Sequence, residues 1–480
     1  MLLALGLAWC CMSCSPAASL PPSSPALAST RCPTPRAAGL ATAIADRPAA
    51  GRAESGGRRA ASPPPARQLW ASTLPGGTAT AEALSPDGTR LFVLGYVGPS
   101  VKSETVAYST VTGARLWAKT YPAKNFGGPG EEIAVSPDGA RVYVTGYSIG
   151  LGAVTIAYAA RTGRQLWASR YQHKGPGPGG LAVSPDGRTV YEAVTGGVSG
   201  KGSYIAVIGY DAATGRQRQW RRYYTNVRHA YAELEGVAVS PDGSTVYVAA
   251  DAGALLPSSF SLLLLAYRAT TRTLKWATRY MNRYSGGNHA GGAFGGPIVP
   301  GPGGGAVYVA GTVSSKAGHH VAATFAFRAA TGRCLWLAPD SARGGGGKVA
   351  VTPGGRTVIF VGDRTGDAVG GYLIACYDAR TGATRWTRRA PVPGNAPDET
   401  AGLVIDPQGD AAFVASSNGG DYDLAAWSAA SGTVLWTTRY AGAKVYSPVA
   451  AVLSRDGTRL FLTGSAEFGG HGMTTVAYQT

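Results

Sequence analysis

Apolar and polar residues alternate over short stretches of this chain, and the stretches end at turns rich in Pro and Gly. The string "AVSPDGARVYVTG" at 134–146 shows the pattern, with apolar residues at every second position on both sides of a Ser-Pro-Asp-Gly turn. Alternation with a period of two is typical of half-buried β-strands, and Pro and Gly suit the central positions of a tight turn. The pattern predicts an all-β protein of many short antiparallel strands.

The same unit recurs eight times. Its turn begins at Ser85, Ser136, Ser184, Ser240, Gly301, Thr352, Asp406 and Ser454. A tryptophan on an outgoing strand recurs at Trp70, Trp117, Trp167, Trp220, Trp276, Trp336, Trp386 and Trp436. A third marker, the aromatic residue of "VAY" and its variants, is also present eight times. A repeat of about 50 residues with four strands in each unit is typical of propeller blades.

The order of these markers predicts how the ring closes. The first tryptophan strand, near Trp70, precedes the first complete unit, and the chain ends on "TTVAYQT" without another tryptophan strand. We therefore predict an all-β, eight-bladed β-propeller of four-stranded antiparallel blades, in which an N-terminal outer strand completes the last blade and removes an exposed sheet edge. Seven blades would result if the unit around Gly301 were an insertion, but the markers on both sides of that unit favour eight.

The chain divides into three segments. Residues 1–19 are apolar at first and resemble a secretory signal, with Cys14 as a candidate for a lipid anchor, although the usual positive start is missing. Residues 20–66 are rich in Ala, Pro, Gly and Ser and are expected to form a disordered tether. Residues 67–480 form the propeller. The protein is therefore expected to be secreted or to lie in the cell envelope, with a lipid anchor as one alternative. No transmembrane span is expected, because the apolar run is too short.

Charge and cysteine content narrow the partner classes. Lys and Arg number 44 against 27 Asp and Glu, a net charge of +17, but the longest basic clusters are pairs. Dispersed basic charge disfavours a nucleic-acid groove and favours attraction to anionic surfaces. No two CxxC pairs are present, so a structural zinc site is not expected. The sequence leaves the redox state of Cys334 and Cys376 open, and a monomer is expected.

The repeated residues are interpreted as architecture. The aspartates of the turns, such as Asp87, Asp138, Asp186 and Asp242, are expected to stabilise the turns rather than to bind metal. The tryptophans are expected to pack between blades. Four arginines, Arg170, Arg279, Arg389 and Arg439, follow a tryptophan by three residues and should face the opposite side of the strand.

The candidate binding site lies where the units differ, in the loops on the face opposite the uniform turns. Scaffolds with variable loops on one face commonly carry binding sites there. The candidate ligand-binding residues are Glu131, Glu132, His229, Tyr231, Glu233, Glu235, Arg283, Tyr284, His289, Asp398 and Glu399. No catalytic or metal-ligating residue is assigned, although His229 with Glu233 or Glu235 would suit a propeller lyase.

Two stretches carry a resemblance to a known family. "YDAATG" at Tyr210–Gly215 and "CYDARTGATRW" at Cys376–Trp386, together with the SPDG strands, resemble the pyrroloquinoline-quinone-like and YVTN-type propeller repeats of bacterial envelope proteins. The resemblance covers about Arg67 to Thr480. It implies a quinone-dependent dehydrogenase with pyrroloquinoline quinone and calcium as one alternative, but the adjacent cysteines that such enzymes carry over the cofactor are absent from the propeller segment. We therefore expect a non-catalytic, exported scaffold without a cofactor that binds a protein, a glycan or a cell-wall surface. Dehydrogenase-like or lyase activity in the central channel is the alternative.

Overall fold

The structure of the protein is a computed structural model. It describes residues 28–29, 32–34, 66–98, 102–121, 130–148, 152–172, 177–198, 202–219, 223–224, 230–254, 261–280, 294–314, 320–364, 371–390, 400–418, 421–441, 445–466 and 472–480. Within these ranges every regular element is a β-strand. None of the described residues forms a helix with the length and apolar character needed to cross a membrane.

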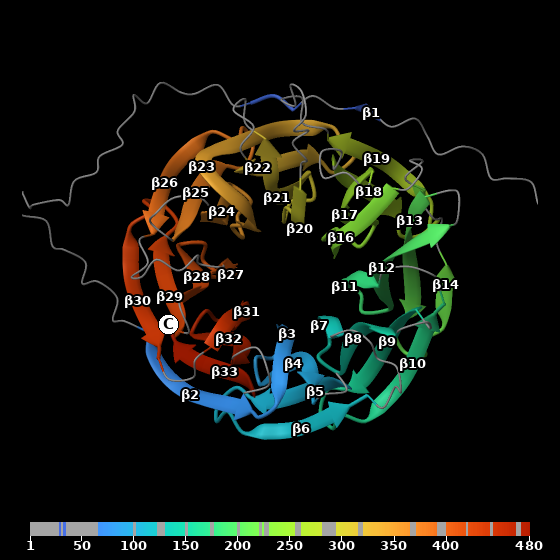
Figure 1. Ribbon diagram of the computed structural model, residues 1–480, viewed down its shortest axis with the longest axis vertical. Coiled ribbons are helices and arrows are strands. Elements are labelled where there is room, and N and C mark those ends of the chain that lie inside the picture. Colours follow the sequence, from blue (N-terminus) through green and yellow to red (C-terminus); the bar gives the residue numbers. More distant parts are fainter. Residues whose placement is uncertain are drawn as a thin grey trace, which may run out of the picture.

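The strands form eight antiparallel blades around a central axis (Figure 1), which confirms the predicted fold class and blade number. Blade 1 contains β3 (Gly77–Leu84), β4 (Arg90–Val97), β5 (Lys102–Ser109) and β6 (Arg115–Thr120). Blade 2 contains β7 (Gly130–Val135), β8 (Arg141–Ser148), β9 (Gly152–Ala159) and β10 (Gln165–Tyr171). Blade 3 contains β11 (Pro178–Val183), β12 (Thr189–Val198), β13 (Gly202–Asp211) and an outer strand in two pieces, β14 (Gln217–Gln219) and β15 (Tyr223–Tyr224).

The second half of the ring continues the pattern. Blade 4 contains β16 (Ala230–Val239), β17 (Thr245–Ala254), β18 (Ser261–Arg268) and β19 (Leu274–Tyr280). Blade 5 contains β20 (Phe294–Pro300), β21 (Ala306–Ser314), β22 (His320–Arg328) and the start of β23 (Cys334–Val351), whose end is the inner strand of blade 6. Blade 6 adds β24 (Thr357–Arg364), β25 (Tyr372–Asp378) and β26 (Thr384–Ala390). Blade 7 contains β27 (Thr400–Ile405), β28 (Ala411–Asn418), β29 (Asp421–Ser428) and β30 (Val434–Tyr440).

Blade 8 closes the ring as predicted. Its strands are β31 (Val445–Leu453), β32 (Arg459–Ala466), β33 (Gly472–Gln479) and the N-terminal β2 (Arg67–Leu74). β2 pairs antiparallel with β33, and Trp70 lies opposite Ala477. The first and last strands of the propeller therefore lie side by side, and neither is left as an unpaired edge at the closure.

Tryptophans of the outer strands join neighbouring blades, as the sequence predicted. The Trp117 indole Nε1 of blade 1 donates a hydrogen bond to the Ala160 carbonyl of blade 2 at 3.0 Å. The indole ring lies against Gly163, where an added Cβ would be 2.7 Å from the nearest ring atom. The same donation is made by Trp70, Trp167, Trp276, Trp336 and Trp386. Each described contact fastens one blade to the turn of the next.

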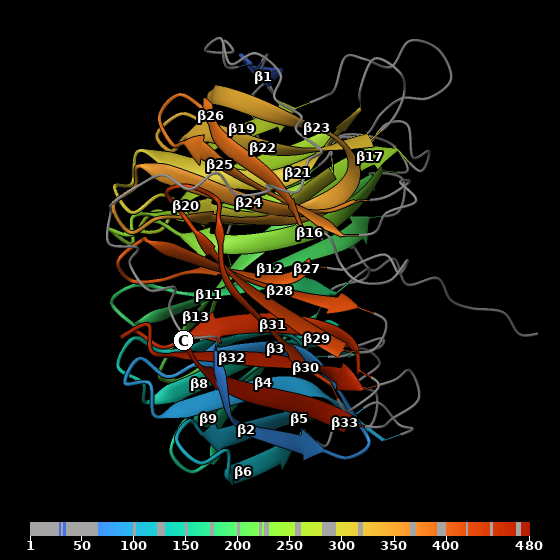
Figure 2. The same ribbon diagram turned by 90° about the vertical axis from the view of Figure 1, so that its left-hand side faces the viewer.

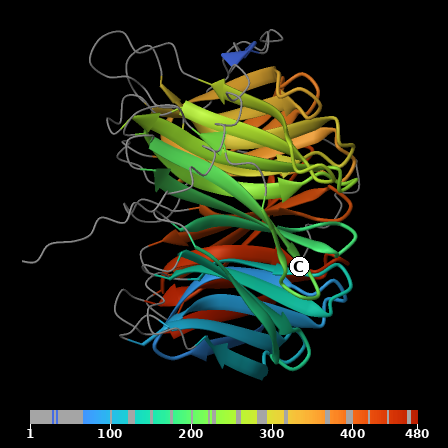
Figure 3. The same cartoon turned by 90° about the vertical axis from the view of Figure 1, so that its right-hand side faces the viewer.

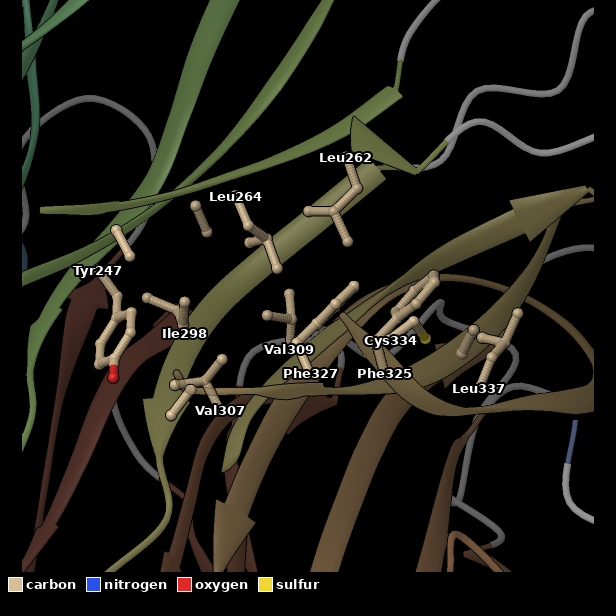
Figure 4. Packing of buried hydrophobic residues seen from close by; sticks show 14 of the residues in the cluster. Tyr247, Leu262, Leu264, Ile298, Val307, Val309, Phe325, Phe327, Cys334 and Leu337 are labelled. Carbon is tan, nitrogen blue, oxygen red and sulfur yellow. The ribbon is translucent and has the colours of Figure 1, made fainter. Parts of the chain in front are cut away.

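Aliphatic and aromatic side chains fill the space between adjacent blades. Figure 4 shows the contact between blades 4 and 5, where Leu264 and Val309 pack with Phe325 and Phe327. All four are fully buried. The alternation predicted from the sequence therefore buries residues of both sheet faces, because each blade is covered by a neighbour on either side.

A short N-terminal segment is attached to the outside of the ring. β1 (Ala28–Ser29) pairs in parallel with β19 at Thr278 and Arg279 and lies outside the blades (Figures 1 and 2). Cys32 forms a disulfide with Cys334, and the Leu337 amide donates to the Pro33 carbonyl. The sequence analysis foresaw neither this short strand nor the cysteine pairing. The remaining residues of 1–65 lie outside the described part of the chain.

Candidate functional site

The structure describes the side chains of three of the eleven candidate residues. Glu132 lies on β7, and Glu233 and Glu235 lie on β16, both of which are inner strands (Figure 1). Glu131 and Tyr231 belong to the same two strands, described here for their backbone only. The other candidates, His229, Arg283, Tyr284, His289, Asp398 and Glu399, lie outside the described residues. Three predicted acidic residues therefore lie in the innermost strands rather than in loops.

A β-bulge interrupts each inner strand at nearly the same distance from its turn. In β7 the pairing passes from Gly130 to Glu132, which leaves Glu131 as the extra residue. In β16 it passes from Leu234 to Gly236, which leaves Glu235 as the extra residue. The other inner strands have a register shift in the same region. A bulge bends the strand and changes the direction of the side chain of the extra residue. In β16 the bulge therefore sets the direction of the Glu235 side chain.

The charges of these residues interact across the ring. Burial raises the pKa of Glu132 to about 7, and the Lys348 ammonium opposes the rise. Burial also raises the pKa of Glu235 to about 7; Glu233 adds to the rise and Lys348 again opposes it. Lys348 lies on β23 in blade 6, four blades from Glu132 in blade 2, so its charge acts on Glu132 from the opposite side of the ring. We call Glu132, Glu233, Glu235 and Lys348 the axial group.

The sequence analysis did not select Lys348 as a candidate, although its position in the repeat indicates it. It lies four residues before its turn, as Glu132 does. The corresponding residues of the other six units are small or rigid: Ala81, Gly180, Gly236, Pro297, Gly402 and Ala450. Aligning the units on their turns would therefore have selected these two charged residues, and the ring closure brings their charges within reach of each other.

Glu82 on β3 is a second residue that the sequence analysis missed. It is 8% exposed and accepts a hydrogen bond from the Thr463 Oγ1 of blade 8 at 2.5 Å. Its other oxygen, Oε1, is buried and has no hydrogen-bond partner. Burial raises the pKa of Glu82 well above its ordinary value. The carboxyl is therefore held neutral at the contact between the first and last blades, where seven other units have an aliphatic residue: Ile133, Leu181, Val237, Ile298, Val349, Leu403 and Ala451.

The repeated aspartates stabilise turns, as predicted. Asp242 accepts hydrogen bonds from the Ser240 Oγ at 2.5 Å and from the Ser244 amide at 3.0 Å. These donors lower the pKa of Asp242 to about 2. Asp87, Asp138 and Asp186 make the same pair of contacts. Their acceptor capacity is used within the turn, so they serve the backbone.

The family resemblance raised a quinone cofactor that is bound together with calcium. Among the described residues no three His, Cys, Asp or Glu side chains are close enough to hold a metal ion. We therefore derive no step through this cofactor.

The fold and its repeated contacts define the class of protein: an eight-bladed propeller whose blades are joined by tryptophans. The family model described as outer membrane protein assembly factor BamB matches residues 59–294 and 321–475. This is more than half of the chain, so the protein belongs to that family of propellers with pyrroloquinoline-quinone-type repeats. None of the curated proteins compared with the chain matches it.

Solved structures with the same fold are distant in sequence. The Dos1 propeller has a TM-score of 0.59 and 11% identity, covering 86% of this chain and 95% of its own. Sqt1 of Chaetomium thermophilum, bound to the N-terminus of the ribosomal protein L10, has a TM-score of 0.58 and 13% identity, covering 85% and 98%. Quinohemoprotein alcohol dehydrogenase from Comamonas testosteroni has a TM-score of 0.54 and 14% identity, covering 86% and 76%. At these identities the likeness shows the fold alone.

Proposed function

We propose that this protein is a non-catalytic, exported scaffold that binds a basic segment of a partner protein at the axis of the ring. The observation that carries the proposal is the axial group. Its members come from three blades and differ from the corresponding residues of most other units. Membership of a family described as an outer membrane protein assembly factor supports a role in protein contacts in the cell envelope.

The disulfide between Cys32 and Cys334 supports export. It links residues that are 302 positions apart in the sequence, and Cys334 is almost completely buried. Disulfides of this structural kind persist in oxidising compartments and are rare where thiols are kept reduced. The buried thiol of Cys376 is a separate case, because burial raises its pKa to about 12 and keeps it unreactive.

The charge of the axial group supports a basic partner segment. Glu132 and Glu235 are partly protonated near pH 7, and a bound cation favours their ionised forms. Binding of a Lys- or Arg-bearing segment is therefore expected to release protons and to strengthen as the pH rises from 6 to 8. Lys348 then leaves room for one acidic residue among the basic residues of the partner segment.

Site-specific photocrosslinking in the native cell tests the proposal. A photoreactive residue at Glu233, which is exposed on an inner strand, is expected to give one discrete protein adduct. The matched position is Val111, which is 63% exposed on a turn of the opposite face and should give none. The adduct should weaken when Glu132→Gln and Glu235→Gln are combined. Equal adducts at the two positions, or a higher unfolding temperature with pyrroloquinoline quinone and calcium, would refute it.

A further inference from the structure

Arg279 has a buried guanidinium edge without an acceptor. It lies on β19, and its Nε and Nη2 atoms are buried and make no hydrogen bond, although the residue as a whole is half-buried. These two atoms form the edge of a guanidinium that binds a carboxylate with two parallel hydrogen bonds. An unpaired buried polar group of this kind destabilises the folded state unless a partner is supplied.

Arg279 faces blade 3. Its neighbours Thr278 and Tyr280 face blade 5: the Thr278 hydroxyl donates to the Gly332 carbonyl, and the Tyr280 ring packs edge-on against Phe325 at 5.0 Å. Arg279 lies on the other side of the strand, as the sequence predicted. Its charge opposes the rise that burial causes in the pKa of Tyr223, a residue of β15 in blade 3. Tyr223 packs in the same buried cluster as Leu263, the residue opposite Arg279, so a guanidinium and a phenol lie in one region between blades 3 and 4.

An equivalent arginine in blade 7 shows which chemical group can bind to this edge of the guanidinium. Arg439 donates from Nε to Asp423 Oδ1 at 2.7 Å and from Nη2 to Asp423 Oδ2 at 2.9 Å. Asp423 lies directly opposite Arg439 in the pairing of β29 with β30. In blade 4 the residue opposite Arg279 is Leu263. The same side-on edge is therefore filled by a carboxylate in one blade and faces an aliphatic residue in the other.

The other two arginines of this position have different surroundings. The Arg170 Nη2 donates to the Tyr121 hydroxyl at 3.5 Å. Arg389 is exposed to solvent, which satisfies its donors. In blade 3, β15 places Tyr223 in the buried cluster that also contains Leu263, the residue opposite Arg279. Arg279 thus combines a buried, unfilled edge with a buried phenol of the neighbouring blade.

We propose that Arg279 is a receptor for the carboxylate of an acidic peptide that enters between blades 3 and 4. The carboxylate accepts two hydrogen bonds from the Arg279 Nε and Nη2, in the arrangement that Asp423 makes with Arg439, and a third from the Tyr223 hydroxyl. This site is separate from the axial group. It makes the outer side of blades 3 and 4, beside the β1 strand that pairs with β19 at Arg279, a second contact surface for a partner segment of opposite charge.

The test follows the Nε–H resonances of the arginines in the 15N-labelled full-length protein. The probe is the blocked tripeptide acetyl-Ala-Glu-Ala-amide, with acetyl-Ala-Gln-Ala-amide as the matched control. The glutamate peptide is expected to shift one Nε–H resonance in a saturable way, and the glutamine peptide is not. Arg279→Lys keeps the charge but removes the two-pronged edge, so binding should weaken at least about tenfold. Arg439→Lys should leave it unchanged.

Three results would overturn the proposal: no saturable shift with the glutamate peptide, equal affinity in Arg279→Lys, or a shift caused by inorganic phosphate but not by the glutamate peptide. If Arg279→Lys does not fold, Leu263→Asp provides a second test. It places a carboxylate where Asp423 lies in blade 7, so the edge of Arg279 becomes filled internally and peptide binding is expected to be lost. Retained binding in a folded Leu263→Asp protein would contradict the assignment.

Discussion

The inner and outer strands of the blades relate to the repeat in opposite ways. The outer strands repeat their side chains: six described tryptophans make the same contact with the next blade. The inner strands repeat their backbone, with a bulge in the same region, but differ in the side chains that follow it. Residues that build the ring are therefore held constant, and those available for a ligand vary at the axis and at single outer positions such as Arg279.

Charge follows the same division. Acidic residues lie on the inner strands at Glu82, Glu131, Glu132, Glu233 and Glu235. Basic residues lie on the outer strands at Arg67, Arg115, Lys119, Arg170, Arg218, Lys275, Arg279, Arg385, Arg388, Arg389 and Arg439. Although the net charge is +17, the inner strands carry mainly acidic residues and the outer strands mainly basic ones. At physiological salt the electrostatic attraction of either region is screened over about 8 Å.

The largest expected effect comes from removing one tryptophan contact on the outer side. Trp336 is 2% exposed, and its Nε1 donates to the Ala379 carbonyl at 3.0 Å. Trp336→Ala should lower the free energy of unfolding by about 3–5 kcal/mol, because it leaves a cavity between blades 5 and 6. Denaturant unfolding measures the loss. The control is Val434→Ala, an exposed residue of β30, which should change stability by no more than about 0.5 kcal/mol. Equal losses would mean that tryptophan contacts do not hold the blades together.

The next effect concerns the disulfide on the outside of the ring. Replacing Cys32 and Cys334 together by Ala should cost about 2–5 kcal/mol, because the unfolded chain regains the freedom that the cross-link removes. Unfolding of the wild type with and without a reductant should give the same difference in the free energy of unfolding. The reductant should not change the free energy of unfolding of the double variant. A wild type that unfolds at the same denaturant concentration in both conditions would show that the cross-link contributes no stability.

The sequence predicted the features that depend on local backbone requirements. The SPDG turns, the tryptophan positions and the closure of blade 8 follow from turn chemistry and from the order of the markers, so they are visible without coordinates. The predicted pattern fails at one turn: Arg272 takes the position that Gly163 has in blade 2, with a positive φ of 59°. An added Cβ at Gly163 would lie 2.7 Å from the Trp117 ring.

The features that were missed depend on contacts between distant residues. The pairing of Cys32 with Cys334 spans most of the chain, and spacing alone does not specify which cysteines meet. Lys348 reaches Glu132 only because the ring brings blades 2 and 6 to a common axis. The unfilled edge of Arg279 depends on strand register, which places Leu263 rather than a carboxylate opposite it. Of the candidate loop residues, only Glu132, Glu233 and Glu235 can be located with their side chains, and all three lie near the axis.

A smaller effect, of opposite sign, is expected on the inner side. Glu82→Leu gives blade 1 the aliphatic residue that the other inner strands have, and it removes the unpartnered Oε1. Replacing a buried ionisable group by a well-packed apolar one typically stabilises a protein by about 1–4 kcal/mol or leaves it unchanged. Because burial raises the pKa of Glu82 in the folded state, its contribution is fully present below the unfolded pKa near 4.5 and is lost as the pH rises towards the folded pKa.

The gain from Glu82→Leu should therefore grow between pH 5 and pH 8. Chemical unfolding at pH 5, 6.5 and 8 measures it, with Thr463→Val as the companion variant that removes only the hydrogen bond to Glu82. A gain that stays constant over this range, or a loss at pH 8, would show that the Glu82 carboxyl is not held neutral at the contact between blades 1 and 8.

The smallest effect concerns the turn that joins an inner strand to its neighbour. Asp242→Asn weakens the hydrogen bonds from the Ser240 Oγ and the Ser244 amide and should cost about 0.5–1.5 kcal/mol at pH 7. Since these donors lower the pKa of Asp242 to about 2, its contribution is present above the unfolded value near 3.8 and is lost as the pH falls through 2. The difference between variant and wild type should therefore shrink between pH 4 and pH 2. Asp410→Asn, at an exposed aspartate of the corresponding turn in blade 7, is the matched control and should have no measurable effect. If Asp242→Asn were equally silent, the turn would not need its carboxylate, and the repeated aspartates would again be candidates for a ligand site.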